Sequence, residues 1–320
     1  MSDNYLIGID GGGTKTIAVA ARKDGTILAA ERGEGINYNN IGMDRARNNL
    51  KDIVDRLESR LEGECEAMSI GMPALDAPAD EALTRAFAGE LFDPGLLDMQ
   101  SDAYMALIGF TLGQAGMIVI CGTGSILLMM DENGTQHVRG GWGPMLGDPG
   151  SGYSLAIDGL KAAIEDWENI GEHTSIAGAA MKHFGLSKPR ELIDRVYADG
   201  QSRASLARFG RCVLEQCDRG DAVAAEIVRR NMAALAANAA EMIGRVPAAN
   251  RIGINGGVLT NSAAARESFT QQLLRRCPDA EVSMPEFPPE LGALIHALNR
   301  RGLLVPETLK NLKTSYGRFL

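Results

Sequence analysis

An apolar strand followed by a glycine-rich turn occurs twice in this chain. The first copy is "YLIGIDGGGTKT", residues 5–16, and the second is "MIVICGTGSI", residues 117–126. Consecutive glycine N–H groups can form a concave site for an anion without steric cost, but a single copy suits a tight hairpin equally well. Because the pattern is repeated, we favour a role in binding phosphate or a nucleotide.

The repeat extends beyond these turns. Each copy continues into a second strand, a further turn and a third strand. Gly13 to Gly25 spans twelve positions, and Gly124 to Gly134 spans ten. Internal similarity of this kind predicts two related domains, with a ligand cleft expected between them. The strands alternate with helical patterns, which predicts an α/β fold with a mixed sheet in each domain.

The predicted domain boundaries follow from the repeat. We expect an N-terminal domain over residues 1–115, joined by the C-terminal helix at about 290–320. A larger C-terminal domain should occupy residues 116–289. It contains a predominantly helical insertion at about 151–245, whose Met and Leu stripes indicate core packing rather than a cofactor site.

Composition excludes several classes of function. A net charge of -9 argues against general nucleic-acid or anionic-membrane binding, since both need clustered Lys and Arg. The start "MSDNYLIGID" has no secretory pattern and no run is long enough to span a membrane, so a cytoplasmic location is expected. The five cysteines and four histidines show no disulfide or metal spacing, and any metal is expected to be oxygen-bound Mg²⁺.

Three aspartates stand at strand ends or turns. Asp10 directly precedes the first glycines, and a carboxylate there would be repelled by phosphate unless a cation lay between them, so Asp10 is predicted to orient hydrated Mg²⁺. Asp102 ends "MQSD" before a helix, and is either a helix cap or the general base for an attacking hydroxyl. Asp148 in "GDPGSG" is either a turn former or a site residue.

Two further segments carry candidate binding residues. The loop "RGGWGPMLGDPGSG" contains Trp142, whose flat face suits a sugar or base ring, although the residue could equally cover a cleft wall. A third glycine-rich turn, "NGGVLTN", follows another apolar strand, which begins "RIGI". The first turn is neither a P-loop, because the four-residue spacer is missing, nor a dinucleotide fingerprint, because a strand follows it.

These segments, and the order in which they occur along the chain, resemble those of the sugar kinase, heat-shock ATPase and actin superfamily. Within it the chain is similar to the N-acetylglucosamine kinase and BadF/BadG-type ATPase group. The matching segments cover residues 5 to about 298 and are "GIDGGGTKT", "INYNNIG", "SDAYMALIG", "GTGS", "GGWGPMLGDPGSG" and "NGGV". The resemblance implies two domains of ribonuclease H-like type, the actin-like ATPase fold, and a tendency toward homodimers.

The resemblance also implies site residues and cofactors. ATP and Mg²⁺ are the implied cofactors and an amino sugar the implied small-molecule partner, with Asp102 as the base for the sugar 6-hydroxyl and Asp10 on the metal side. The residues implied around ATP are Gly12, Gly13, Thr14, Lys15, Gly122, Thr123, Gly124, Gly256 and Gly257. Those implied at the sugar, besides Asp102, are Asn37, Trp142, Asp148 and Ser151.

The implied function is ATP-dependent phosphorylation of an amino sugar, with N-acetylglucosamine favoured and glucosamine next. Ile126 departs from the pattern, since many N-acetylglucosamine kinases of the group have Asn there, and an apolar side chain cannot donate that hydrogen bond. Two alternatives stay open. One is a dehydratase activator, which needs an iron–sulfur cluster although Cys212 and Cys217 lack Cys-x-x-Cys spacing. The other is a non-catalytic sugar or nucleotide sensor.

Overall fold

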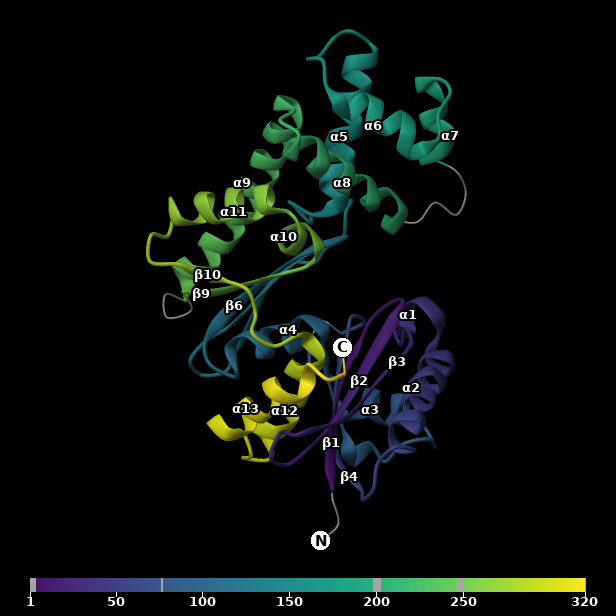
Figure 1. Ribbon diagram of the computed structural model, residues 1–320, viewed down its shortest axis with the longest axis vertical. Helices are drawn as coiled ribbons and strands as arrows, with labels where there is room; N and C mark the ends of the chain where they lie inside the picture. Colours follow the sequence, from purple (N-terminus) through teal and green to yellow (C-terminus); the bar gives the residue numbers. More distant parts are fainter. Residues whose placement is uncertain (1–3, 76, 198–202, 247–249, 320) are drawn as a thin grey trace. The chain divides into compact units, whose positions relative to one another are not determined.

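The computed structural model describes residues 4–75, 77–197, 203–246 and 250–319. The chain forms two compact units, Met1–Gln114 with Pro285–Leu320, and Ala115–Met284. Each unit contains one five-stranded mixed sheet with helices packed against it (Figure 1). The predicted α/β fold class is therefore confirmed. Residues 198–202, which belong to the predicted helical insertion, lie outside the described part of the chain.

The first sheet has the strand order β3-β2-β1-β4-β5. β1 runs antiparallel to β2 and parallel to β4, and β4 runs parallel to β5. Its members are β1 (Tyr5–Gly11), β2 (Lys15–Arg22), β3 (Ile27–Glu34), β4 (Cys65–Met72) and β5 (Leu97–Ser101). The three parallel strands therefore bring their carboxyl ends to one edge, where Asp10 and Asp102 occur.

Helices cover both faces of this sheet. Figure 1 shows α4 and α12 on one side and α2 on the other. Gly8 allows the approach of α12, because a Cβ there would lie 2.4 Å from the Leu294 nitrogen. The helices of this unit are α1 (Tyr38–Ile41), α2 (Met43–Glu58), α3 (Glu81–Ala88), the 3₁₀ turn η1 (Pro94–Leu96), α4 (Asp102–Thr111), α12 (Pro289–Arg300) and α13 (Pro306–Tyr316).

The C-terminal segment differs from the single helix expected at about 290–320. It forms two helices, α12 and α13, with a break over residues 301–305. Gly302 takes a positive φ of 68°, which ends the first helix, and Pro306 stands at the start of the second, where its fixed φ is favourable.

The second sheet repeats the topology of the first, with the order β10-β9-β6-β7-β8. β6 runs antiparallel to β7 and parallel to β9, so it occupies the position that β1 has in the first sheet. Its members are β6 (Gly116–Cys121), β7 (Ser125–Met130), β8 (Gln136–Gly140), β9 (Arg251–Asn255) and β10 (Glu281–Ser283). The two glycine-rich turns of the sequence thus join equivalent strands.

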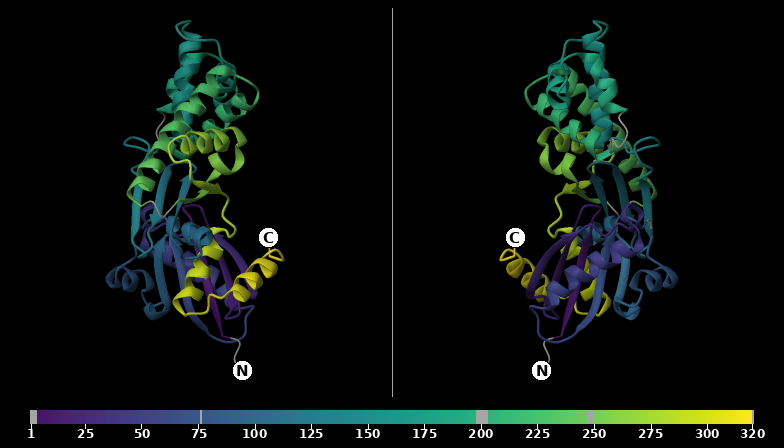
Figure 2. Two further views of the ribbon diagram at one scale, coloured as in Figure 1. Left: turned by 90° about the vertical axis from the view of Figure 1, so that its left-hand side faces the viewer. Right: turned by 90° about the vertical axis from the view of Figure 1, so that its right-hand side faces the viewer.

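The predicted helical insertion lies between β8 and β9 and belongs to the core of the second unit. Its apolar stripes pack with β6, β7 and α11 in one buried cluster that includes Phe209, Met232 and Phe269. Figure 2 shows these teal and green helices from two sides. The helices of the insertion are α5 (Gly152–Trp167), α6 (Ser175–Phe184), η2 (Pro189–Glu191), α7 (Leu192–Val196), α8 (Arg203–Asp218) and α9 (Ala222–Arg245), and β9 is followed by α10 (Gly257–Asn261) and α11 (Ala263–Leu274). Over the described ranges, no helix combines the length and apolar character needed to cross a membrane.

Candidate nucleotide and sugar site

Asp10 and Asp102 lie near each other at the carboxyl edge of the first sheet. Asp10 is paired with Gly71 of β4, and Gly71 is paired with Gln100 of β5, two residues before Asp102. A Cβ on Gly71 would lie 2.8 Å from Met105 Cγ and 3.4 Å from the Asp102 Cα, so the glycine leaves room for the first turn of α4. The sheet register therefore brings the two predicted carboxylates together.

The helix-capping role considered for Asp102 is filled by its neighbour. Ser101 is the N-cap of α4, and its Oγ accepts a hydrogen bond from the Tyr104 nitrogen at 3.1 Å. Asp102 is the first helical residue, and its Oδ1 accepts from the Ala103 nitrogen at 2.7 Å. Burial raises the pKa of Asp102 against the lowering effect of that backbone bond. A carboxylate with a raised pKa is a better proton acceptor, as a general base requires.

Asp10 is the more strongly perturbed of the two carboxylates. Burial raises its pKa to about 7, the nearby carboxylates of Glu290 and Asp102 add to the increase, and Lys15 opposes it. Glu290 on α12 is 5% exposed and accepts a hydrogen bond from the Tyr316 hydroxyl of α13. Sequence reasoning did not single out Glu290, because only the packing of α12 on β1 places it near Asp10.

The pKa of Asp10 leads to a stability prediction. With the pKa near 4 in the unfolded chain and about 7 in the fold, Asp10 destabilises the protein progressively as pH rises from about 4 to 7. We expect Asp10→Asn to raise the free energy of unfolding by about 1–3 kcal/mol at pH 8 in Mg²⁺-free buffer, and by less at pH 5. Urea denaturation at both pH values measures this. Asp44→Asn, at a carboxylate 91% exposed, is the control and should show no such gain. An Asp10→Asn protein less stable than the wild type at pH 8 would contradict the prediction.

The first glycine-rich turn joins β1 to β2. The Gly12 nitrogen donates to the Lys15 carbonyl at 2.8 Å, and a Cβ on Gly12 would lie 2.6 Å from that oxygen. Gly13, Thr14 and Lys15 are exposed, and the nearest atom to a Cβ on Gly13 is Asn40 Nδ2 at 3.5 Å. Gly12 is thus required by the turn itself, whereas Gly13 leaves open surface that an anion could approach.

Asn37, a predicted sugar residue, lies next to this turn. The Ile36 nitrogen donates to the Gly12 carbonyl at 3.1 Å, which holds the segment leading to Asn37 against the turn. Asn37 is the N-cap of α1, and its Oδ1 accepts from the Asn39 nitrogen at 3.1 Å. The side chain is half-buried, so part of it is accessible to a ligand.

The second glycine-rich turn lines a cavity of about 900 Å³ within the second unit. Gly122 and Thr123 form one part of its wall and Gly257 another. A Cβ on Gly122 would have the Gly257 nitrogen at 3.9 Å as its nearest neighbour, so no protein atom fills the space that this glycine leaves. The cavity is large enough for a nucleotide, and its glycine-lined wall suits the close approach of phosphate groups.

The neighbouring glycines have internal packing reasons. Gly256 has a φ of 86°, and a Cβ there would lie 2.5 Å from the Cys121 carbonyl group. A Cβ on Gly124 would lie 2.7 Å from Asp148 Oδ2. At both positions a side chain would clash with neighbouring protein atoms. Glycine is therefore needed there for packing of the turns.

Asp148 and Ser151 lie inside the loop that supports the second turn. Asp148 is 4% exposed with a positive φ of 60°, and Ser151 is fully buried. Ser151 is the N-cap of α5, with its Oγ accepting from the Ser154 nitrogen at 3.1 Å. The Gly152 nitrogen donates to the Gly122 carbonyl at 2.7 Å, which ties the start of α5 to the turn. The structure therefore gives Ser151 a capping role.

Trp142 occupies the exposed part of the same loop and is 74% exposed. Gly140, Gly141 and Gly143 have positive φ values around it. Ile126 of β7 lies below the loop, since a Cβ on Gly141 would be 3.0 Å from Ile126 Cδ1. The residue that departs from the family pattern is therefore adjacent to the loop for which the resemblance implies a sugar contact.

Helix α8 supplies a wall of the nucleotide-sized cavity that sequence reasoning missed. Arg208, Arg211 and Glu215 line it. Gly210 permits this approach, because a Cβ there would lie 2.3 Å from the Gly152 carbonyl oxygen at the start of α5. No local sequence signal marks these residues, since their place depends on how α8 packs against α5.

The two cysteines considered for an iron–sulfur site are both on α8. Cys212 Sγ lies 3.5 Å from His183 Nδ1, and burial raises the pKa of both Cys212 and Cys217. Among the side chains that the structure describes, no group of three or more His, Cys, Asp or Glu is arranged to hold a metal ion.

Comparison with known proteins places these features in a family. The model of the BadF/BadG/BcrA/BcrD ATPase family matches residues 7–297. The chain belongs to this ATPase family. The predicted membership is thereby confirmed, and it implies the use of ATP.

Curated relatives of the family resemble the chain over nearly its whole length. An N-acetyl-D-glucosamine kinase of Dictyostelium discoideum is 29% identical over 325 residues, covering 94% of this chain and 100% of that protein. An N-acetylmuramic acid/N-acetylglucosamine kinase of Clostridium acetobutylicum is 28% identical, covering 92% and 98%.

Solved structures share the fold. A protein from Chromobacterium violaceum, assigned as an N-acetylglucosamine kinase, superposes with a TM-score of 0.72 at 24% identity, covering 92% of this chain and 98% of that one. A ROK family glucokinase from Streptomyces griseus gives a TM-score of 0.59 at 16% identity over 92% and 98% of the two chains. At these identities the likeness concerns the fold alone.

Proposed function

We propose that this protein is an ATP-dependent kinase that transfers the γ-phosphate of ATP to the 6-hydroxyl of an amino sugar, with N-acetylglucosamine favoured and glucosamine next. The observation that carries the proposal is the setting of Asp102. It is held by the sheet register beside Asp10, it is relieved of capping by Ser101, and burial raises its pKa. The similarity to kinases of N-acetylglucosamine and N-acetylmuramic acid supports the substrate class.

In this proposal the chain's residues position the reactants. Asp102 accepts the proton of the sugar hydroxyl, and the exposed backbone of Gly13 and Thr14 and the open face of Gly122 bind phosphate oxygens. Thr123 and Gly257 line the cavity of about 900 Å³ together with Gly122, and they would border the rest of the nucleotide. Positioning and neutralisation of charge supply most of the catalysis in phosphoryl transfer.

We propose that Mg²⁺ binds together with ATP. This ion usually keeps several waters and needs only one or two carboxylates in addition to the phosphates, so a single carboxylate at the turn is a suitable protein contribution. Asp10, half-buried at the end of β1, would hold it, and the ion would neutralise phosphate charge. A cation there would also favour the ionised form of Asp10, whose pKa is raised to about 7 in its absence.

The sugar side is assigned to the loop around Trp142, with Asn37 as a further contact. Trp142 offers an exposed ring for stacking, while buried Asp148 and Ser151 hold the loop. In the proposal, Ser151 therefore acts by supporting the loop.

Ile126 leads to a prediction about substrate preference. An asparagine there could donate a hydrogen bond to an acetamido group, which is worth about 1 kcal/mol, so Ile126→Asn should raise the ratio of kcat/KM for N-acetylglucosamine to that for glucosamine about fivefold to tenfold. Steady-state kinetics with both sugars measures the ratio, and Ile126→Leu is the control that should leave it unchanged. Equal effects of Ile126→Asn on both sugars would argue against contact between this position and the acetamido group.

A coupled assay of ADP release over a panel of hexoses and amino sugars tests the proposed function. ADP release that depends on an amino sugar supports the kinase. Sugar-independent release would point to an ATPase such as a dehydratase activator, and no release with any sugar would point to a sensor. Either of the last two outcomes overturns the proposal.

A further inference from the structure

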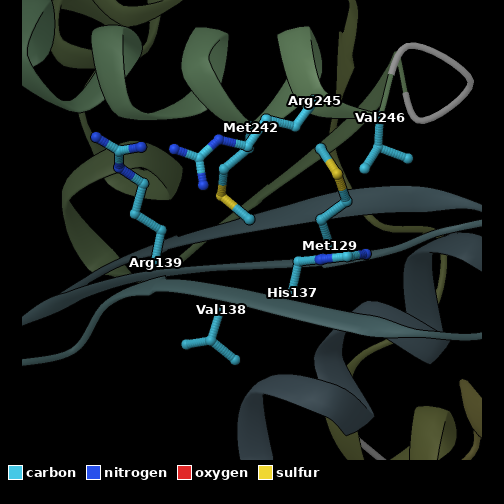
Figure 3. A pocket seen from close by; sticks show the side chains of 7 residues that line it. All are labelled: Met129, His137, Val138, Arg139, Met242, Arg245 and Val246. Carbon is cyan, nitrogen blue, oxygen red and sulfur yellow. The ribbon is translucent and has the colours of Figure 1, made fainter.

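A second cavity, of about 250 Å³, lies on the second unit between β8 and the end of α9 (Figure 3). It shares no lining residue with the larger nucleotide-sized cavity. Among the residues that the structure describes, β8 is the edge strand of its sheet. The crevice is therefore a feature of the sheet edge and is independent of the proposed kinase site.

The residues on the two sides of the crevice follow from regular spacing. Asn238, Met242 and Arg245 are four and three residues apart on α9, so they share one helical face. His137 and Arg139 are two residues apart on β8 and therefore lie on the same face of the strand. His137 is directly opposite Met129 of β7. The Arg139 Nε donates to Asn238 Oδ1 at 3.0 Å, which joins the strand to the helix.

Positive charge gathers at one end of the crevice. Figure 3 shows the guanidinium groups of Arg139 and Arg245 turned toward the same end, with the Met242 thioether on that side and the Met129 thioether on the side toward which the His137 ring points. His137 lies 3.3 Å from the Asp131 carboxylate. Two guanidinium groups thus line one small cavity in a chain whose net charge is -9.

Other arginines on the same helix have acidic partners. Arg229 pairs with Glu226 at 2.6 Å, and Arg230 with Asp158 at 3.3 Å. Arg245 stands in the last turn of α9, where a cation is favoured by the helix dipole. That effect does not account for Arg139, which comes from the neighbouring strand and is bonded through its Nε, leaving its two terminal nitrogens available to a ligand.

We propose that this crevice binds a small phosphomonoester, with its phosphate group between Arg139 and Arg245 and its carbon skeleton against Met129 and Met242. Guanidinium groups match phosphate oxygens in paired hydrogen bonds, and thioether side chains adapt to irregular apolar groups. The volume of about 250 Å³ limits the ligand to a short chain or a single ring.

Isothermal titration of the full chain with glycerol 3-phosphate tests the proposal, with inorganic phosphate and glycerol as parallel titrants. We expect glycerol 3-phosphate to bind more tightly than inorganic phosphate, and glycerol not to bind. The double variant Arg139→Gln/Arg245→Gln should lose at least about 100-fold in affinity at this site, and Arg245→Gln alone about tenfold. Anion binding at the glycine-rich turns is common to all variants, so the difference between proteins isolates the crevice.

Arg229→Gln is the matched control, since it removes one positive charge from the same helix outside the crevice. It should bind glycerol 3-phosphate as the wild type does. Arg245 is exposed at the helix end, so the single variant tests the proposal even where loss of the Arg139 bond to Asn238 weakens the fold. The proposal is overturned if the wild type binds neither phosphate compound at millimolar concentration. It is also overturned if Arg245→Gln binds as tightly as the wild type, if Arg229→Gln loses as much as Arg245→Gln, or if inorganic phosphate binds as tightly as glycerol 3-phosphate.

Discussion

Replacing Asp102 by asparagine should reduce kcat for sugar phosphorylation by roughly 10²- to 10⁴-fold, the usual loss when a general base is removed. Asparagine has nearly the same shape, and its Oδ1 can still accept the hydrogen bond from the Ala103 nitrogen. The free energy of unfolding should therefore change by less than about 0.5 kcal/mol. Steady-state kinetics and urea denaturation of the same preparation separate the two effects.

The pH profile offers a second readout for Asp102. Because a base acts only when ionised and burial raises the pKa of this carboxyl, wild-type turnover should fall as pH decreases through that raised pKa, and Asp102→Asn should lack this limb. Asp80→Asn is a matched control, since Asp80 caps α3 through a 2.7 Å bond from the Leu83 nitrogen and asparagine caps equally well. Activity of Asp102→Asn within a few-fold of the control would show that another group is the base.

Replacing Gly122 by valine should abolish productive ATP binding while leaving the fold intact. The new side chain would project into the cavity of about 900 Å³ in the direction proposed for the phosphates, and its Cβ would meet no protein atom closer than 3.9 Å. We expect kcat/KM for ATP to fall by at least about 100-fold, because a misplacement near 1 Å is enough to cost that much. Isothermal titration calorimetry with a non-hydrolysable ATP analogue measures the lost binding directly.

Gly124→Ala provides the contrast within the same turn. Its Cβ would lie 2.7 Å from Asp148 Oδ2, inside the protein, so this variant should lose stability by about 1–3 kcal/mol. If Gly122→Val binds the ATP analogue as the wild type does, the cavity is not the nucleotide site. If Gly122→Val instead unfolds like Gly124→Ala, the space beside Gly122 is needed for packing.

Glycine composition alone could not separate these two positions. "GTGS" contains two glycines two residues apart, and both look equally suited to a phosphate. The structure shows that Gly122 borders open space and Gly124 a buried carboxylate. The difference depends on Asp148, which stands 24 residues further along the chain.

The sequence alone also could not decide whether Asp102 caps the helix that follows it. The residues "MQSD" before a helix allow either Ser101 or Asp102 to be the cap, because both types cap well. The hydrogen bond from the Tyr104 nitrogen to Ser101 Oγ decides the question. Glu290 and the α8 residues Arg208 and Arg211 gave no local signal, since they reach their positions through helix packing between segments distant in sequence.

The α/β class, the duplicated strand and turn pattern, the family and the two candidate aspartates of the first sheet could all be inferred from the sequence. These properties are local, because strand periodicity and the need for glycine in tight turns are expressed within a few residues. Tertiary contacts were needed to show which glycine faces a cavity, which residue caps α4, and why the pKa of Asp10 rises. Those outcomes depend on burial and on charges brought together by the sheet register and the packing of α12. Burial and the proximity of such charges cannot be read from neighbouring residues in the sequence.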